Sequence, residues 1–233
     1  MADRLERLRA LIDGSRAAIF DFDNVIVDSE PFHYRAYSEV FGARGHTIDE
    51  DDYWVEWTSK GGGAEKEIKR YGLGFDPLDI RAEKDPLYSS YCESGEIPVF
   101  PYAMKVIRSL GASGLVLAIA SGSYERDIRA LLRYNGIEEM FAAIVGKDGI
   151  ELTKPHPETY LRAVKALGLG PGDCFAIEDA EKGVIAAHAA GMKVITVETR
   201  VTKGFDLGDP DIAFSGLDEL YSMMVAAGLR PAD

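Results

Sequence analysis

The chain has few cysteines, no long apolar run and a deficit of basic residues. Its 233 residues include two cysteines, Cys92 and Cys174, which are too few and too far apart to indicate a disulfide framework or a zinc site. No apolar run approaches the length of a membrane span. The N-terminal residues alternate in charge and lack the apolar stretch of a signal peptide. We therefore expect a cytoplasmic protein with no membrane partner.

The charge balance limits the partners of the chain. Lysine and arginine number 26 against 39 aspartate and glutamate residues, which gives a formal net charge of −13. So acidic a chain is poorly suited to bind nucleic acid or an anionic membrane surface. A small phosphorylated metabolite is not excluded, because it responds to the charges immediately around it. We expect no nucleic-acid partner, and a monomer or a weak oligomer.

Strand and helix patterns alternate through most of the chain. Strands are predicted over residues 17–22, 115–120, 141–145, 174–177 and 194–197, and helices over residues 3–13, 124–134, 157–167, 180–190 and 217–227. This alternation predicts an α/β fold, a Rossmann-like parallel sheet with helices on both faces. Ligands of such sheets bind beyond the carboxyl ends of the strands, where the strand order reverses.

A helical segment interrupts the alternation. Residues 31–98 carry amphipathic helix patterns without a convincing strand, with breaks at glycines 61–63, at residues 71–74 and at Asp76-Pro77. We interpret residues 31–98 as an all-helical cap domain. It is inserted into a core domain formed by residues 1–30 and 99–233.

The most informative feature is the end of the first predicted strand. The apolar run of residues 17–20 leads into Asp21-Phe22-Asp23, which places two carboxylates one residue apart. Residues i and i+2 of an extended chain point the same way. Two acids so close repel each other unless a cation or a shared proton compensates. Asp21 and Asp23 therefore predict metal binding or acid–base chemistry.

Three further polar groups follow later strands of the predicted sheet. Residues 121–123 follow the second strand, Lys154 lies in the loop after the third, and Glu178-Asp179 end the fourth. Each also has a simple structural explanation. Ser121 or Ser123 can cap a helix, Lys154 can be a solvated loop residue, and acidic residues favour a helix N-terminus.

Those explanations do not predict that the groups meet, whereas a parallel sheet brings the carboxyl ends of its strands to one edge. That edge would hold four carboxylates, a hydroxyl at a helix N-terminus and one lysine. Carboxylates bind Mg²⁺, which retains waters that a phosphate can displace. The helix N-terminus and the lysine suit the phosphate itself. The sequence thus predicts a phosphate-handling site with Mg²⁺ as its cofactor.

The four groups, in this order and spacing, resemble the signature motifs of the haloacid dehalogenase-like hydrolase superfamily. The resemblance covers about residues 16–225. It is closest to the branch with a helical cap after the first motif, which contains β-phosphoglucomutase and many sugar-phosphate phosphatases. By this resemblance Asp21 is expected to be the nucleophile that forms an aspartyl-phosphate. Asp23 is expected to act as the general acid and base, which requires a raised pKa for its carboxyl.

The resemblance also implies a ligand set. Asp21, the backbone carbonyl of Asp23 and Asp179 are expected to bind Mg²⁺, with Glu178 as a further ligand or a support for the others. The phosphate is expected to contact Ser121, Gly122 and Lys154.

Several residues depart from the family pattern or leave their role open. Asn24 replaces the usual glycine, and asparagine tolerates the left-handed backbone better than most residues. Lys60 is a candidate substrate contact in the cap, as is Asn24 beside the first motif. His33, Trp54 and Trp57 could face the substrate, although packing is the favoured role of each.

The expected function is that of a Mg²⁺-dependent phosphatase acting on a sugar or polyol phosphate. A β-phosphoglucomutase-like mutase is the main alternative, but the mutases place lysine and asparagine where this chain has Tyr124 and Glu125. Glu125 would repel a second phosphate. A protein that binds a phosphorylated ligand without turnover is the other alternative, and it would have no need of the acid Asp23.

Overall fold

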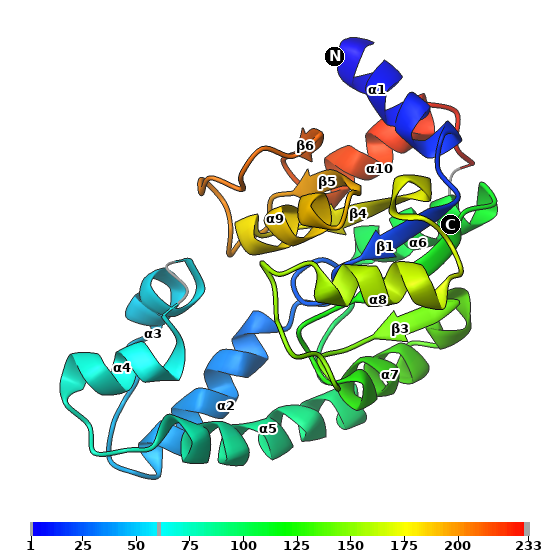
Figure 1. Ribbon diagram of the computed structural model, residues 1–233. Coiled ribbons are helices and arrows are strands. Elements are labelled where there is room, and N and C mark those ends of the chain that lie inside the picture. The colour runs from blue at the N-terminus through cyan, green and yellow to red at the C-terminus, as the bar shows by residue number, and fades with distance from the viewer. Residues whose placement is uncertain (1, 60–61, 231–233) are drawn as a thin grey trace.

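A six-stranded parallel sheet forms the centre of the protein (Figure 1). The structure is a computed structural model that describes residues 2–59 and 62–230. The strands are β1 (Ala17–Phe20), β2 (Val116–Ala120), β3 (Ala143–Val145), β4 (Cys174–Glu178), β5 (Lys193–Val197) and β6 (Ile212–Phe214). Their spatial order is β3-β2-β1-β4-β5-β6, with every neighbouring pair parallel. The order reverses between β1 and β4, where α/β sheets bind their ligands.

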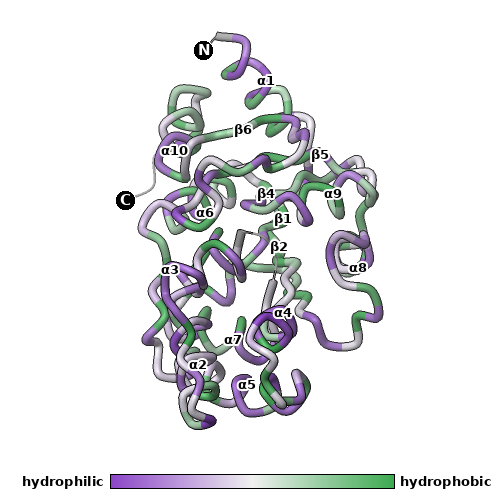
Figure 2. Tube along the Cα trace, turned by 90° about the vertical axis from the view of Figure 1, so that its left-hand side faces the viewer, coloured by the Kyte–Doolittle hydropathy of each residue, from purple (hydrophilic) through white to green (hydrophobic). Residues whose placement is uncertain are grey.

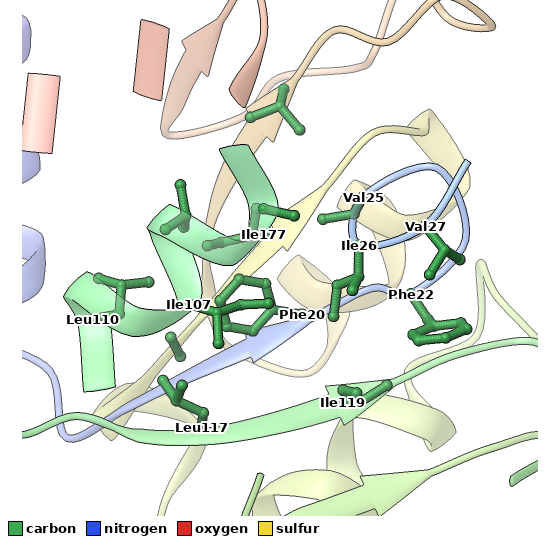
Figure 3. Close-up of a cluster of buried hydrophobic side chains, with 14 of the residues drawn as sticks. Phe20, Phe22, Val25, Ile26, Val27, Ile107, Leu110, Leu117, Ile119 and Ile177 are labelled. Carbon is green, nitrogen blue, oxygen red and sulfur yellow. The ribbon is translucent and has the colours of Figure 1, made fainter. Parts of the chain in front are cut away.

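Helices cover both faces of the sheet because its central strands are apolar on both sides. Ala18 and Phe20 of β1 pack on one face, and Ala17 and Ile19 pack on the other. Figure 3 shows part of the first cluster, with Phe20 beside Ile107 of α6. The first face is covered by α1 (Ala2–Asp13), α6 (Pro101–Ala112), α7 (Glu125–Tyr134) and α10 (Leu217–Ala226). The second face is covered by α8 (Glu158–Ala166) and α9 (Glu181–Ala189). Short 3₁₀ helices span Glu138–Met140 and Pro171–Asp173.

A group of helices lies beyond the carboxyl edge of the sheet. These cap helices are α2 (Glu30–Gly42), α3 (Glu50–Asp52), a π-helical segment (Tyr53–Ser59), α4 (Gly63–Tyr71) and α5 (Pro77–Ser94). In Figures 1 and 2 they lie on the side of the molecule away from β6 and α10. They enclose a small apolar core of their own, centred on Phe41, Tyr53 and Trp57. The α5 helix is long enough to reach back to α7.

The predicted fold class is confirmed, with small differences in the elements. The α6 helix and strand β6 were not predicted. Apolar residues recur at helical spacing in α6, whereas the three residues of β6 are too few to show a pattern. Strand β1 ends at Phe20, before the predicted Phe22, because the chain turns and Asp23 forms a bridge with Val27. No helix within residues 2–59 and 62–230 has the length and apolarity needed to cross a bilayer.

Candidate active site

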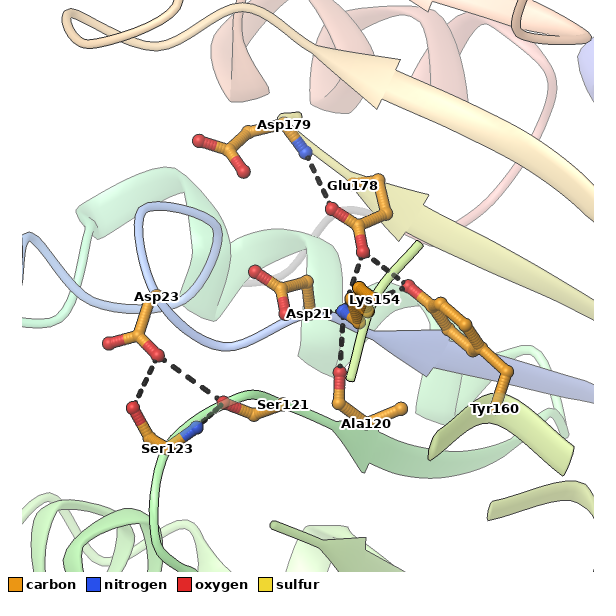
Figure 4. Close-up of polar contacts among 9 residues, drawn as sticks. All are labelled: Asp21, Asp23, Ala120, Ser121, Ser123, Lys154, Tyr160, Glu178 and Asp179. Carbon is orange, nitrogen blue, oxygen red and sulfur yellow. Dashed lines mark hydrogen bonds and ion pairs between the residues drawn. The ribbon is translucent and has the colours of Figure 1, made fainter. Parts of the chain in front are cut away.

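The polar groups singled out in the sequence lie together at the carboxyl edge of the sheet (Figure 4). Asp21 follows β1, Ser121 follows β2, Glu178 ends β4, and Lys154 comes from the loop after β3. Asp21 and Glu178 therefore flank the position where the strand order reverses. The groups line a cavity of about 680 Å³, whose wall also includes Trp57 from the cap helices.

Lys154 joins the first and fourth strands through its ammonium group. Its Nζ donates to Asp21 Oδ1 at 2.7 Å, to Glu178 Oε1 at 2.6 Å and to the carbonyl oxygen of Ala120 at 2.9 Å. The side chain is only 8% exposed. Burial disfavours the charged amine, but the charges of Asp21 and Glu178 outweigh it and raise the pKa of Lys154. The lysine is therefore cationic at neutral pH.

Three carboxylates form a candidate metal site beside this lysine. One oxygen from each of Asp21, Glu178 and Asp179 lies within 4.8 Å of the others, and all three residues are buried. Burial, opposed by Lys154 and reinforced by the neighbouring acids, raises the pKa of Asp21 to about 7. Burial and the charges of Asp21 and Glu178 raise the pKa of Asp179 well above its usual range. An all-oxygen site with excess negative charge fits a hard divalent cation such as Mg²⁺.

Asp23 points away from this cluster toward the loop after β2. Its Oδ2 accepts hydrogen bonds from Ser123 Oγ at 2.6 Å and from Ser121 Oγ at 3.3 Å. Its Oδ1 accepts a hydrogen bond from Tyr88 at 3.3 Å, and His33 Nε2 lies 3.8 Å away. The Asp23 carboxylate is therefore not part of the acidic cluster formed by Asp21, Glu178 and Asp179.

The expectation of a raised pKa for Asp23 is wrong for the substrate-free protein. Burial alone would raise it, but the nearby His33 ring and the hydrogen bond from Ser123 favour the charged carboxylate, and together they lower the pKa below its usual range. Sequence spacing shows which residue follows the strand. It does not show which donors from the cap helices surround that residue.

Comparison with known proteins identifies the family. The family model of the haloacid dehalogenase-like hydrolase matches residues 15–191. The chain belongs to the haloacid dehalogenase-like hydrolase family. The resemblance noted in the sequence is confirmed.

Relatives of this haloacid dehalogenase-like hydrolase include a CbbY protein and a named sugar-phosphate phosphatase. Protein CbbY of Rhodobacter capsulatus is 32% identical over 208 residues, which cover 84% of this chain and 91% of the relative. The fructose-1-phosphate phosphatase YqaB of Escherichia coli is 31% identical over 182 residues, covering 77% of this chain and 94% of YqaB. A variant of CbbY from Rhodobacter sphaeroides, solved in complex with xylulose-(1,5)bisphosphate, superposes with a TM-score of 0.75 at 26% identity. That comparison covers 88% of this chain and 96% of the solved one.

Several residues of this hydrolase site were not singled out as functional in the sequence. Tyr160 of α8 donates a hydrogen bond to Glu178 Oε1 at 2.6 Å and supports the carboxylate from behind. Tyr88 of α5 stacks on the His33 ring, with centroids 4.0 Å apart, and brings the cap helices to Asp23. Thr199, after β5, donates to Asp179 Oδ2 at 3.4 Å. All come from helices or loops whose facing partners depend on the tertiary fold, so spacing carries no signal for them.

The remaining candidate residues do not all lie at the cavity. Asn24 adopts φ 61° and lines the cavity, in agreement with the expected left-handed backbone. Gly122 also lines the cavity. Trp57 is buried in the core of the cap helices, and its Nε1 donates to Glu67 at 3.2 Å. Lys60 lies outside the described residues.

Proposed function

We propose that this haloacid dehalogenase-like phosphatase hydrolyses a small phosphorylated metabolite, a sugar or polyol phosphate, through an aspartyl-phosphate on Asp21. The observation that carries the proposal is the pairing of Asp21 with a buried cationic lysine, Lys154, at 2.7 Å. A carboxylate approaches a phosphate dianion only where positive charge offsets their repulsion. Lys154 supplies that charge on the side of the nucleophile.

In the first step the Asp21 carboxylate oxygen attacks the phosphorus of the ester. An Asp21 O–P bond forms, the ester P–O bond breaks, and the leaving oxygen takes a proton from Asp23. Ser121 and the backbone of Gly122 hold the phosphoryl oxygens at the start of the loop after β2. Phosphoryl transfer depends mainly on this alignment and on charge neutralisation.

In the second step water attacks the phosphorus of the aspartyl-phosphate while Asp23 accepts a proton from it. The Asp21 O–P bond breaks, and inorganic phosphate leaves. The lowered pKa of Asp23 keeps its carboxyl ionised in the substrate-free protein, which is the form that can accept a proton. A phosphate dianion bound beside Asp23 raises its pKa, because like charges disfavour ionisation. Asp23 therefore takes up a proton from solvent as the substrate binds, and this is the proton that it donates to the leaving oxygen in the first step.

Asp21, Glu178 and Asp179 would hold Mg²⁺, together with the backbone carbonyl of Asp23. Mg²⁺ supplies positive charge to the transferring phosphoryl group. The raised pKa values of Asp21 and Asp179 support this assignment, because they show that the buried acids lack enough compensating positive charge from the protein.

The relatives support a sugar or polyol phosphate as the substrate. YqaB carries the name fructose-1-phosphate phosphatase, and CbbY was solved with a sugar bisphosphate. The mutase alternative is not favoured by the residues that follow the serine loop, residues 121–123. Glu125 begins α7, and its backbone N–H donates to Asp148 Oδ2 at 2.7 Å. The Asp148 carboxylate thus occupies a donor at the N-terminus of α7 that a second phosphate would need, and its charge opposes that phosphate.

A phosphate-release assay over sugar, polyol and nucleotide phosphates, with and without Mg²⁺, tests the proposal. Asp21→Asn and Asp23→Asn should each lose at least about 10³-fold in kcat, since they remove the nucleophile and the proton-transfer group. Asp209→Asn, an exposed aspartate in the loop before β6, is the matched control and should retain wild-type turnover. Near-wild-type release by a verified Asp21→Asn preparation would eliminate the covalent mechanism.

A further inference from the structure

One carboxylate lies between two lysines on the side of the cavity formed by α5. Lys84 Nζ lies 3.6 Å from Asp85 Oδ1, and Lys147 Nζ lies 3.7 Å from Asp85 Oδ2. Lys84 and Asp85 belong to α5, whereas Lys147 comes from the loop after β3. All three line the same cavity as the nucleophile. We call Lys84, Asp85 and Lys147 the bridged lysine pair.

The bridged lysine pair adjoins the part of the cavity that holds Asp23. Lys84 Nζ lies 4.5 Å from the centre of the Tyr88 ring, and the Tyr88 hydroxyl contacts Asp23. Lys147 Nζ lies 3.5 Å from the centre of the Tyr124 ring, directly after the serine loop. In the proposed reaction Asp23 faces the leaving oxygen, so the organic part of the ester extends to this side. The bridged lysine pair is therefore suited to meet the far end of the substrate.

Two free lysines at this position would attract a second phosphate. Asp85 weakens this attraction, because its negative charge lies between the two ammonium groups, offsets one of their two charges and repels an approaching phosphate. Lys84 is only 6% exposed, so its charge is committed to Asp85 and to the faces of Tyr37 and Tyr88. A lysine that is paired with a carboxylate attracts a phosphate less strongly than an unpaired lysine does.

The N-terminus of α7 is the other feature on this side of the cavity that could bind an anion. The N-terminus of α7 would offer free backbone N–H groups to a phosphate. Here the N–H of Glu125 donates to Asp148 Oδ2 at 2.7 Å, while the Glu125 side chain pairs with Arg129 on the same helix at 2.7 Å. The first N–H of α7, next to the cavity residue Tyr124, is thus already paired with a carboxylate. This observation is independent of the bridged lysine pair.

We propose that Asp85 sets the substrate class of this site, selecting esters with a single phosphoryl group and rejecting bisphosphates. The inference rests on the proposed phosphatase function. The far end of the preferred substrate carries hydroxyl groups. These hydroxyl groups donate hydrogen bonds to Asp85 and accept hydrogen bonds from the two lysines. Substitution of Asp85 by asparagine keeps the size of the side chain and frees both lysines for a second phosphate.

The test compares fructose 1-phosphate with fructose 1,6-bisphosphate, which differ by one phosphoryl group. The wild-type protein should show a higher kcat/KM for the monophosphate. Asp85→Asn should move the ratio of the two kcat/KM values toward the bisphosphate by about tenfold or more, which corresponds to the loss of one modest repulsion. A ratio within one protein is insensitive to the active fraction of the preparation.

Two variants serve as controls. Asp79→Asn removes an exposed aspartate from the same helix and should leave the ratio unchanged. Addition of Lys147→Ala to Asp85→Asn should remove most of the gain for the bisphosphate, since one of the two freed cations is lost. A wild-type ratio near one, or a ratio that Asp85→Asn does not move, would overturn the assignment of Asp85.

Binding of the same two esters to Asp21→Asn protein, measured by calorimetry, separates this inference from the proposed function. If the wild-type protein releases no phosphate from any ester while Asp21→Asn binds the monophosphate more tightly, the preference stands and the hydrolytic function fails. Asp21→Asn/Asp85→Asn should then shift the affinity ratio toward the bisphosphate. Equal affinities in both backgrounds would overturn the role of Asp85 even if hydrolysis is observed.

Discussion

Arg200, in the loop after β5, stacks over the indole ring of Trp54 in the cap helices, with Cζ 4.8 Å from the ring centre. The same guanidinium lies 3.7 Å from Asp28, where the chain leaves the sheet for the cap helices. The next two residues of this loop, Val201 and Thr202, line the cavity. One side chain thus connects the sheet, the start of the cap helices and a cavity wall.

Arg200→Ala should therefore lower kcat/KM by about 2- to 5-fold, the effect of losing one exposed cation–π contact of about 0.5–1 kcal/mol. Trp54 and Trp57 are the two tryptophans of the chain, so intrinsic fluorescence reports on the cap helices. We expect a change of emission in Arg200→Ala that is absent when Trp54 is also replaced by Phe. Arg133→Ala, at an exposed arginine of α7 that pairs with Glu138, is the control. Unchanged emission and unchanged kcat/KM in Arg200→Ala would refute a link between loop and cap.

The stabilisation of the protein by Mg²⁺ should increase with pH. The folded-state pKa of Asp21, about 7, lies above its usual value of 3.8. The free energy of folding that this raised pKa contributes is complete below pH 3.8 and is lost as the pH rises through about 7. The pKa of Asp179 is raised in the same direction. Mg²⁺ binds the ionised carboxylates, so protons compete with it. At a concentration 100-fold above Kd the ion should add about 2.7 kcal/mol.

Thermal denaturation with and without Mg²⁺ at pH 5 and pH 8 measures this linkage. The rise in Tm should be larger at pH 8, and Asp179→Asn should lose most of it. Asp209→Asn should keep the wild-type response. An equal rise at both pH values, or a full response in Asp179→Asn, would contradict binding at these carboxylates.

The sequence was a good guide wherever position along a strand determines position in space. The carboxyl ends of parallel strands meet at one edge, so the order of the strands predicts that Asp21, Lys154 and Glu178 lie near one another. The left-handed backbone of Asn24 follows from its place in the first motif, where glycine is usual. These predictions depend on connectivity and on backbone geometry alone.

The sequence was a poor guide wherever a side chain from another element decides the outcome. The pKa of Asp23 is lowered because His33 of the cap helices and Ser123 of the loop after β2 favour its charged form, and no spacing relates those elements to β1. Tyr160 supports Glu178 through a contact between α8 and β4. The bridged lysine pair likewise joins α5 to a loop more than 60 residues later in the chain. Such contacts are fixed by packing of the folded protein.

Lys154→Met should destabilise the protein by about 3–5 kcal/mol at pH 8, because it removes the partner of two buried carboxylates. The pKa of Lys154 is raised in the folded protein, so the stability that the charged lysine contributes is complete below pH 10.5. Without the lysine the pKa of Asp21 rises further, and Asp21 is protonated at pH 5. The loss of stability should therefore be smaller at pH 5 than at pH 8.

Urea denaturation at the two pH values measures that difference, with Lys165→Met as the control. Lys165 lies on the exposed face of α8, and its replacement should change stability by less than about 0.5 kcal/mol at either pH. A loss in Lys154→Met that is small at both pH values would show that the lysine does not compensate the buried acids.

Gly183 gives Glu178 the space that it occupies. A Cβ atom on Gly183, in α9, would overlap the Glu178 carboxylate itself. The overlapping group cannot move freely, since Glu178 is 1% exposed and is held by Lys154 and Tyr160. Gly183→Ala should therefore displace the carboxylate of Glu178 from its position beside Asp21 and Asp179, even though alanine favours the helix by about 1 kcal/mol over glycine.

We expect Gly183→Ala to weaken Mg²⁺ binding by at least about tenfold, within the range reported for lost supports of metal ligands. Calorimetric titration with Mg²⁺ gives the affinity directly. Gly172→Ala is the matched control, because no atom lies within 4 Å of a Cβ built there and its backbone is not left-handed. Glu178→Asp in the Gly183→Ala background shortens the displaced side chain by one methylene and should recover part of the affinity. If Gly183→Ala binds Mg²⁺ as tightly as the wild-type protein, the position of Glu178 does not contribute to the metal site.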